Sequence, residues 1–278
     1  MKQLVVTADD FGAAREVNEA IEIAHTRGIL TAASLMVAAP AASEAVALAK
    51  RISSLRVGLH VVLVEGKPVL PPSQVPDLVD STGHFRTDMA ASGAKMFFFP
   101  SVRRQLAREI EAQFEAFRAS GLPLDHVNAH KHFHLHPTIA SEILRIGKNF
   151  GMRALRVPRE PRNVLAEIEP QPADPVSVIT APWSALLARR LKANSVVSPD
   201  QVFGLRWSGA MTASRVHALL DRLPNGLTEI YLHPATGPYA GSAPGYRYAE
   251  ELAALTDSGV IQAANRPQVA RGGLADFA

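Results

Sequence analysis

Residues 4–10 read Leu-Val-Val-Thr-Ala-Asp-Asp, a run of apolar and β-branched residues that ends in two aspartates. Such a run is typical of a buried strand, and the amphipathic segment from Val17 to His25 that follows it is typical of a helix. The same alternation continues to about Pro234, which is the pattern of βα units around a parallel sheet. The sequence therefore predicts an α/β fold of the βα-barrel type.

The remaining elements follow from the same two periodicities. Further strands are expected at residues 30–37, 56–63, 125–128, 154–158, 202–205 and 228–233, and further helices at 42–50, 102–117, 138–150, 185–191 and 212–223. We find no internal repeat and no linker of domain length, so residues 1–278 are predicted to form a single catalytic domain. It carries a Pro- and Gly-rich loop insertion at about 64–100 and a C-terminal extension at about 240–278, whose last residues we expect to be partly disordered or to pack against a neighbour.

Composition restricts the kinds of site that the chain can build. The 278 residues include no cysteine, which excludes disulfides, a thiol nucleophile and a cysteine-ligated metal, so any metal must be held by His, Asp or Glu. The net charge is only +3, and no Lys/Arg stripe or stacking motif accompanies it. We therefore predict no nucleic-acid partner.

The N-terminal segment lacks the apolar core of a signal peptide, because it turns acidic at Asp9. The most apolar stretch, residues 29–42, is broken by Thr31, Ser34 and Pro40 and is shorter than the about 20 residues of a membrane span. We expect a cytoplasmic protein without a transmembrane helix, with peripheral contact at the inner membrane face as an alternative. The oligomeric state is left open, a homo-oligomer included.

Polar groups stand at or near the ends of three predicted strands: Asp9-Asp10, His60, and the run from His130 to His136. Ligand sites of parallel α/β sheets are built at this carboxyl edge. Two adjacent aspartates repel each other unless a cation or a shared proton relieves them, and a divalent metal is the simplest relief. The alternative is that the aspartates cap the following helix.

His130, His132, His134 and His136 alternate, so they share one face if the segment is extended. A metal takes two or three histidines, and the others then support the ligands or face the substrate. The alternatives are a solvated polar edge for this run and a core position for His60.

One Asp and two His with open coordination positions indicate metal-assisted hydrolysis, in which a carboxylate takes the proton of the attacking water. Asp9 and Asp10 could divide the roles of base and ligand. His233, which ends the last predicted strand, could protonate a departing amine, or it could be structural.

These residues together resemble the YdjC-like carbohydrate deacetylases, which include the chitooligosaccharide deacetylases. The motifs that carry the resemblance are Thr7-Ala8-Asp9-Asp10-Phe11-Gly12, Gly58-Leu59-His60, Asn128-Ala129-His130-Lys131-His132-Phe133-His134 and Leu232-His233-Pro234. The wording from Ala129 to Pro137 is most similar to the branch associated with hopanoid biosynthesis, which is thought to remove the acetyl group from an N-acetylglucosaminyl hopanoid lipid.

The resemblance implies an irregular (β/α) barrel akin to polysaccharide deacetylases. It also implies one divalent metal ion, magnesium or zinc, held by Asp10, His60 and His130, with Asp9 as general base and His233 as general acid. The chain departs from the oligosaccharide-active members at Asn128, where those tend to have Asp. This departure speaks against a chitooligosaccharide substrate and leaves the ligand set intact.

Several side chains are candidates for substrate binding. Phe97 and Phe98 stand beside Arg103 and Arg104, so they could cover an apolar tail or enter a membrane interface, or they could begin the core face of the next helix. Trp183 and the residues up to Arg190 present the same alternatives.

The other substrate-binding candidates are His132, His134 and Arg156. Arg156 could also orient Asp9 or form a surface ion pair. The partner that we expect is an N-acetylated sugar or glycolipid. A metal phosphoesterase and a non-catalytic sugar or lipid carrier remain as rival functions.

Overall fold

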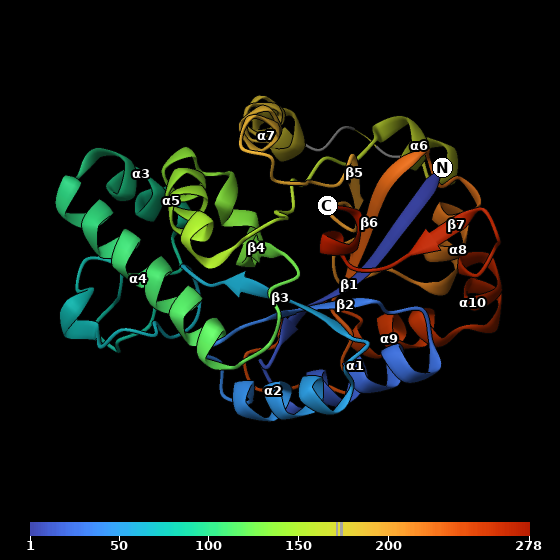
Figure 1. Ribbon diagram of the computed structural model, residues 1–278, viewed down its shortest axis with the longest axis horizontal. Coiled ribbons are helices and arrows are strands. Elements are labelled where there is room, and N and C mark those ends of the chain that lie inside the picture. Colours follow the sequence, from blue (N-terminus) through green and yellow to red (C-terminus); the bar gives the residue numbers. More distant parts are fainter. Residues whose placement is uncertain (171, 173–174) are drawn as a thin grey trace.

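The computed structural model describes residues 1–170, 172 and 175–278. At its centre is a curled sheet in which every paired strand is parallel to its neighbours, in the order β4-β3-β2-β1-β6-β5, with β7 on the same edge of β1 as β2 (Figure 1). The strands are β1 Lys2–Phe11, β2 Ala32–Leu35, β3 Arg56–Val61, β4 Val127–Ala129, β5 Gln201–Phe203, β6 Gly226–Leu232 and β7 Val269–Arg271. The α/β class and the parallel sheet are as the sequence predicts.

The sheet is not a continuous closed barrel. The prediction of a strand at residues 154–158 is wrong. Only isolated parallel bridges form there, between Val127 and Leu155 and between Ala154 and Val197. Arg156 donates its backbone N–H to the carbonyl of Val127 at 3.0 Å, which adds one more bond on the β4 side. Single bridges therefore span the side between β4 and β5, and the molecule is a curled half-barrel.

Helices surround the sheet. They are α1 Arg15–Arg27, α2 Ala42–Arg51, α3 Met89–Phe98, α4 Pro100–Ala119, α5 Pro137–Gly147, α6 Arg162–Ile168, α7 Pro175–Ala193, α8 Ala213–Asp221, α9 Tyr248–Thr256 and α10 Ser258–Ala264. Short 3-10 turns lie at η1 Pro72–Gln74, η2 His130–Leu135, η3 Lys148–Phe150 and η4 Leu274–Phe277. In Figure 1, α1 and α2 lie below the sheet, α3, α4 and α5 to its left, α7 above it and α8 and α10 to its right. Among the described residues no helix combines the length and the hydropathy of a membrane span.

The segment expected as a loop at about 64–100 contains η1 and the whole of α3. It is fastened to α4, because the buried Glu109 accepts backbone N–H groups of Val69 and Leu70 at 2.9 and 3.1 Å. Phe97 and Phe98 end α3 and are exposed, so the alternative that they form a core face is wrong.

The two faces of the strands have different surroundings, because successive side chains point to opposite sides. On β1, Leu4, Val6 and Ala8 pack outward into the main core beneath the helices. Thr7 and Asp9 are buried on the other face. The same alternation on the other strands brings polar side chains to the inside of the curl, where the site is built: Ser34, His60, Asn128, Glu229 and Tyr231.

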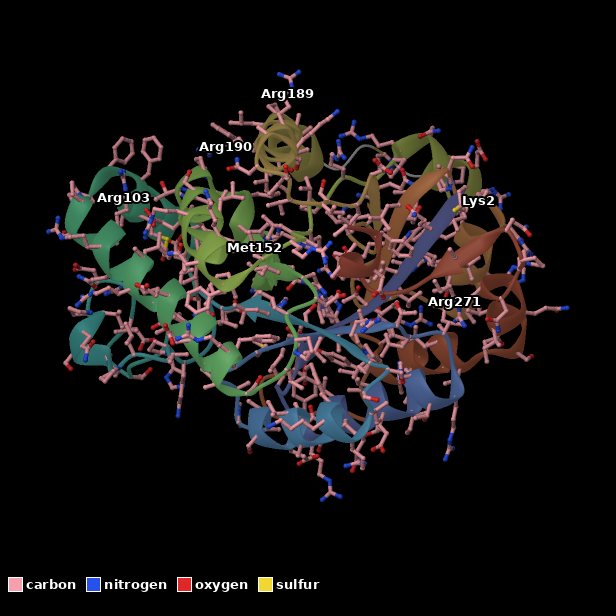
Figure 2. All side chains as sticks on the ribbon, viewed as in Figure 1. Lys2, Arg103, Met152, Arg189, Arg190 and Arg271 are labelled. Carbon is pink, nitrogen blue, oxygen red and sulfur yellow. The ribbon has the colours of Figure 1, made fainter. Side chains whose placement is uncertain are left out.

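The C-terminal extension belongs to this fold. β7 pairs with the first residues of β1, and Lys2 and Arg271 from these strands lie on the same side of the molecule (Figure 2). The following turn buries Leu274 against Val5, Ala32 and other apolar residues at the amino ends of the strands. The expectation of a partly disordered tail is wrong, because these last residues close the bottom of their own sheet. Packing against a neighbouring molecule stays a prediction.

Candidate functional site

Asp9 and Asp10 both reach the inside of the sheet, although they are consecutive. The register between β1 and β2 shifts between Ala8 and Phe11, and Asp10 has a left-handed backbone with φ 63°. A bulge of this kind re-aims a side chain that a regular strand would turn away. The alternative that Asp9 and Asp10 cap the following helix is wrong, because α1 begins at Arg15 and its N-cap residue is Ala14.

Three side chains meet at the carboxyl edge of the sheet: Asp10, His60 and His130, whose ligand atoms all lie within 4.8 Å of one another. Oδ1 of Asp10 is 3.4 Å from Nε2 of His60 and 3.3 Å from Nδ1 of His130. The two imidazoles meet edge to face, with ring centroids 5.6 Å apart. The structure thus brings together the three residues that the sequence indicates as metal ligands.

The atoms of this cluster fit a divalent cation. Oδ1 of Asp10 and Nε2 of His60 are buried, and neither has a hydrogen-bond partner among the described residues, whereas buried polar atoms are normally satisfied. Burial would raise the pKa of the Asp10 carboxyl, but the close polar contact and charge of His130, 3.3 Å away, hold that pKa well below its usual value. An ionised carboxylate with two imidazoles is a donor set that zinc and other divalent metals accept, and it does not choose among them.

The histidine-rich segment is not extended, so the prediction of one shared histidine face is wrong. Residues 130–135 form η2, in which Lys131 and His132 have left-handed backbones with φ 53°. The chain turns here directly from β4 into α5, and Phe133 is buried in the core. This turn sends the histidines to different places, and of the four only His130 belongs to the cluster.

Arg156 lies beneath the cluster and is completely buried. Its Nη1 donates to Oδ2 of Asp9 at 2.5 Å and its Nη2 donates to Oδ1 at 3.0 Å. The same guanidinium donates to both oxygens of Glu229, at 3.0 and 2.7 Å, and lies 4.6 Å from the ring centre of Tyr231. The surface ion-pair alternative for Arg156 is therefore wrong, and its guanidinium holds Asp9 from below.

This ion pair sets the charge of Asp9. Burial would raise the pKa of its carboxyl, but the charge and hydrogen bonds of Arg156, together with the nearby His60 and His233, outweigh burial and bring that pKa far below the usual value. Asp9 is thus a carboxylate throughout the physiological pH range.

Asn128 connects Asp9 to the cluster. Its Nδ2 donates to Oδ1 of Asp9 at 3.0 Å, and its Oδ1 lies 2.6 Å from Nδ1 of His60. An acceptor at Nδ1 places the proton there, so Nε2 of His60 is left with its lone pair toward Asp10. Asn128 thereby orients both Asp9 and His60.

A buried polar chain continues from Asn128 toward the bottom of the sheet. Nδ2 of Asn128 also donates to Oγ of Ser34 at 2.9 Å, and Ser34 lies 3.0 Å from Nε2 of His126. Nδ1 of His126 meets Asp125 at 2.8 Å, and Asp125 accepts the backbone N–H groups of Leu274 and Ala275. The C-terminal turn and the site are therefore linked by hydrogen bonds. Gly58 makes room for His126, since a Cβ there would be 2.5 Å from the imidazole ring.

His233 lies on the opposite side of the site, at the end of β6. Its ring packs against Tyr231 and Tyr246, with centroids 5.6 and 5.2 Å away, and its Nδ1 has no partner among the described residues. The backbone N–H of His233 donates to the buried Glu251, which fixes the start of the loop that follows β6.

The other predicted substrate contacts lie in three different surroundings. Nε2 of His132 is 3.0 Å from the hydroxyl of Tyr231, and burial with the charge of Arg156 holds the pKa of His132 well below its usual value. His134 is completely buried, with Nε2 2.9 Å from the carbonyl of Arg156, so it supports the floor and is not exposed to a substrate. Phe97 packs near His136, with ring centroids 6.3 Å apart, outside the cluster.

His132 is one of the residues that line a cavity of about 1000 Å³. Apolar side chains from α3, η2, α6 and α7 form much of its wall, among them Met89, Phe133, Leu165 and Ala181, and Trp207 from the loop after β5 adds to it. Arg159 and Glu160 supply polar groups on the β5 side. A large apolar cavity beside a polar cluster is the usual form of a binding site for a small molecule.

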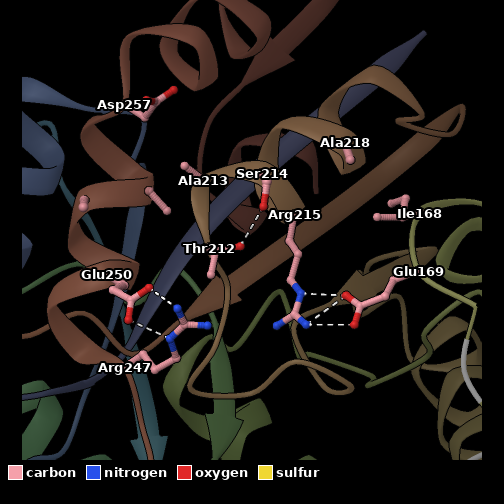
Figure 3. Close-up of a pocket in the computed structure, with 12 residues that line it drawn as sticks. Ile168, Glu169, Thr212, Ala213, Ser214, Arg215, Ala218, Arg247, Glu250 and Asp257 are labelled. Carbon is pink, nitrogen blue, oxygen red and sulfur yellow. Dashed lines mark hydrogen bonds and ion pairs between the residues drawn. The ribbon is translucent and has the colours of Figure 1, made fainter.

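A second cavity, of about 820 Å³, lies between α6, α8 and α9 (Figure 3). Arg215 is paired there with Glu169 at 2.8 Å, and Arg247 is paired with Glu250. Its arginines are already neutralised by carboxylates of the same cavity, so it offers no counterpart to the Asp–His cluster.

Sequence reasoning missed several residues of the site. Glu229, Ser34, His126 and Tyr231 were not singled out, although a Glu in the apolar run 227–232 is a signal for a buried ion pair. Their roles depend on which residues face them across the sheet, and a single strand does not contain that information.

The fold and the cluster define the class of this protein: an α/β protein with an Asp–His–His site of metal-binding type at the carboxyl edge of a curled parallel sheet. A family model described as YdjC-like protein matches residues 3–266. The chain is 32% identical over 262 residues to a carbohydrate deacetylase of Geobacillus stearothermophilus, a match that covers 92% of this chain and 90% of that protein. The chain therefore belongs to the YdjC-like family.

Other relatives match over a shorter range. A carbohydrate deacetylase of Brevibacillus brevis is 38% identical over 148 residues, which is 53% of this chain and 56% of that protein, so the match spans about half of either. A crystal structure from Enterococcus faecalis V583, described as a candidate cellobiose-phosphate cleavage protein, is similar with a TM-score of 0.77 and 24% identity. It covers 100% of this chain and 99% of that one, and at this identity it supports the fold alone.

Proposed function

We propose that this chain is a metal-dependent carbohydrate deacetylase that hydrolyses the acetamide of an N-acetylglucosamine unit, with residues 1–278 as a single catalytic domain. The observation that carries the proposal is the placement of Asp9, an ionised carboxylate held by Arg156, directly beside the Asp10–His60–His130 cluster. The relatives named carbohydrate deacetylase support the same reaction class.

In this proposal Asp10, His60 and His130 hold one divalent ion. When bound, the ion would supply Lewis-acid chemistry, polarising the amide carbonyl and making water more acidic. Asn128 keeps His60 in the tautomer that a metal ligand needs, and it holds Asp9 at the same time.

Asp9 is proposed as the general base. The attacking water gives its proton to a carboxylate oxygen of Asp9 while Arg156 and Asn128 fix the carboxylate plane. Because Arg156 lowers the basicity of Asp9, the carboxylate keeps the proton only transiently. His233 is proposed to donate a proton from its ring to the departing nitrogen.

The proposed substrate is lipid-linked, an N-acetylglucosaminyl hopanoid in the first place. The resemblance of residues 129–137 to the hopanoid branch supports this choice, and so does the apolar cavity of about 1000 Å³ next to His132. His132 would then mark the junction between the sugar and its apolar carrier. A chitooligosaccharide is the second candidate, favoured by the wider family membership.

The test is acetate release by the enzyme loaded with Mg²⁺ or Zn²⁺. We expect turnover of N-acetylglucosaminyl hopanoid and little turnover of di-N-acetylchitobiose, followed as the loss of one acetyl group by mass. Asp9→Asn should reduce turnover by about 100-fold or more. Turnover of the sugar alone would keep the reaction and reject the lipid. Binding without acetate release by a metal-loaded protein would instead favour a carrier, and phosphate release from a phosphoester would favour a phosphoesterase.

A further inference from the structure

Large apolar side chains are exposed at only two places besides Met1 in the part of the chain whose burial the structure describes. One is the end of α3 with the residue after it, where Phe97, Phe98 and Phe99 are 47%, 71% and 55% exposed. The other is α7, where Trp183 and Leu186 are 46% and 44% exposed. Exposed aromatic residues that gather in this way indicate an interaction surface.

These two places are neighbours through α5. Phe97 lies against His136 at the start of α5, and Arg190 of α7 donates to Oγ of Ser141 on α5 at 3.0 Å. Arg103, Arg189 and Arg190 all lie along the upper margin of the view in Figure 2. We call the exposed side chains of Phe97–Phe99, Trp183 and Leu186, with the flanking Arg103, Arg104, Arg189 and Arg190, the aromatic–basic face.

The two segments that form this face carry charge of one sign. No Asp or Glu occurs in residues 89–108 or 175–199, whereas these ranges contain Lys95, Lys192 and the arginines at 103, 104, 108, 189 and 190. Arg103 also donates to the carbonyl of Phe97 at 2.6 Å, which ties the cationic side chain to the aromatic tip. Aromatic rings with adjacent cations match the interface of a bilayer that carries anionic lipids.

The same two helices also line the apolar cavity. Its wall includes Met89 of α3 and Ala181 and Ser184 of α7, so the cavity lies between the two helices that form the face. A substrate whose apolar part is held in a bilayer could therefore enter the cavity without crossing water.

We infer that the aromatic–basic face docks the protein on an anionic lipid bilayer, with α3 and α7 on either side of the entrance to the apolar cavity. The inference deepens the proposed function, and only its link to the substrate rests on that function. Docking itself requires the exposed rings and cations and no acetyl group.

The test is sedimentation of the full-length protein with sucrose-loaded vesicles of phosphatidylcholine and phosphatidylglycerol at 3:1, compared with phosphatidylcholine alone. We expect binding to the anionic vesicles that weakens with salt. Phe98→Ser with Trp183→Ser should weaken it about tenfold or more. Arg104→Gln with Arg189→Gln should weaken it about 30-fold, because each basic side chain near an anionic surface contributes about fivefold.

The matched control is Arg15→Gln with Arg51→Gln, which removes the same charge from exposed positions on α1 and α2, on the other side of the sheet in Figure 1. It should retain binding within about twofold. Failure of the wild-type protein to sediment, or an equal loss in this control, would overturn the inference. So would a lipid-free dimer that Phe98→Ser with Trp183→Ser dissociates, since the face would then belong to a second copy.

Acetate release from a short N-acetylated sugar separates this inference from the proposed function. Both face variants should hydrolyse any such sugar that the wild type accepts at the wild-type rate. If the face variants lose vesicle binding and keep this activity, the result supports the aromatic–basic face as a membrane-docking surface that catalysis does not need. Vesicle binding by a protein that deacetylates nothing would refute the proposed function and keep the face.

Discussion

Arg156 and Asp9 form a two-point ion pair on the floor of the site, with Nη1 2.5 Å from Oδ2 and Nη2 3.0 Å from Oδ1. The same guanidinium binds Glu229, so one cation is shared by two buried carboxylates from β1 and β6. A lysine ammonium cannot reproduce these paired bonds, because it lacks the planar fork of arginine.

Arg156→Lys should lower kcat by about 10- to 100-fold, since Asp9 loses its fixed plane. The pKa of the Asp9 carboxyl should rise, because lysine keeps the positive charge but loses the paired hydrogen bonds of Arg156 that help to keep this pKa low. The acid limb of the kcat profile should then move to higher pH. Profiles of kcat against pH measure this, with Arg153→Lys, an exposed change on the same segment, as the control. An unshifted acid limb would argue against Asp9 as the base.

Chelation of divalent ions should abolish acetate release, and added Mg²⁺ or Zn²⁺ should restore it. Asp10→Asn or His60→Ala should reduce metal affinity by about 100-fold or more in a calorimetric titration, because each removes one of three ligands. His136→Asn is the matched control, since His136 belongs to the same histidine run, lies outside the cluster and caps α5, a position that Asn suits. An equal loss of metal in this control would refute the assignment of ligands.

Asn128→Asp should lower kcat by about 10- to 100-fold and leave metal binding closer to the wild type. The new carboxylate can still accept from Nδ1 of His60, but it can no longer donate to Asp9, and it adds a second negative charge 3.0 Å from the Asp9 oxygen. Kinetics and a metal titration on the same preparation separate the two effects. Equal kcat values for the two proteins would show that the amide donor is dispensable.

Acid should destabilise the metal-free protein through His134. Burial lowers the pKa of His134 to about 3, from a usual value of 6.5. Between pH 6.5 and pH 3 the unfolded chain therefore binds a proton at His134 that the folded chain does not bind. The free energy of unfolding falls as the pH drops through this range. Urea midpoints at pH 7 and pH 4.5 in the presence of a chelator measure this slope. His134→Gln, which keeps a donor for the carbonyl of Arg156, should show a smaller slope, and an identical slope would assign the effect to other groups.

Leu274→Ala should lower the free energy of unfolding by about 2–5 kcal/mol, because the side chain is completely buried among the apolar residues at the bottom of the sheet. The midpoint of thermal unfolding measures the change. Val269→Ala is the comparison on the same extension, since Val269 is only partly buried, and its effect should be clearly smaller. A similar small effect for both would show that the C-terminal turn adds little to stability.

Much of the fold could be predicted because β1, α1 and their successors carry local periodicities. The strand run at residues 4–7 and the helix run from Val17 appear in the structure with boundaries shifted by a few residues. The seven-residue helix α6 was missed, because it lies in a Pro-rich region and is too short to show a clear apolar rhythm. The bridges at residues 154–155 did not become a strand, since pairing there depends on distant neighbours.

The candidate metal ligands could be predicted because each lies at or near the carboxyl end of a recognisable strand, and because the motifs around them resemble those of a known family. The conformation around them could not. Left-handed backbones at Asp10, Lys131 and His132 are imposed by the surrounding structure and have no local signal. The partners of Arg156 are 147 and 73 residues away in the chain, at Asp9 and Glu229, so only the assembled sheet reveals them.

The place of β1 in the sheet has a consequence for the order in which the protein is made. One edge of β1 pairs with β2, which starts at Ala32. The other edge pairs with β6, which starts only at Gly226 and is therefore synthesised much later. On the ribosome β1 therefore leaves the exit tunnel long before its second partner exists, and an apolar strand remains with an unpaired edge. Asp9 and Arg156 can meet in this period without Glu229. A chain that stops before residue 226 should accordingly aggregate instead of giving a weakened enzyme.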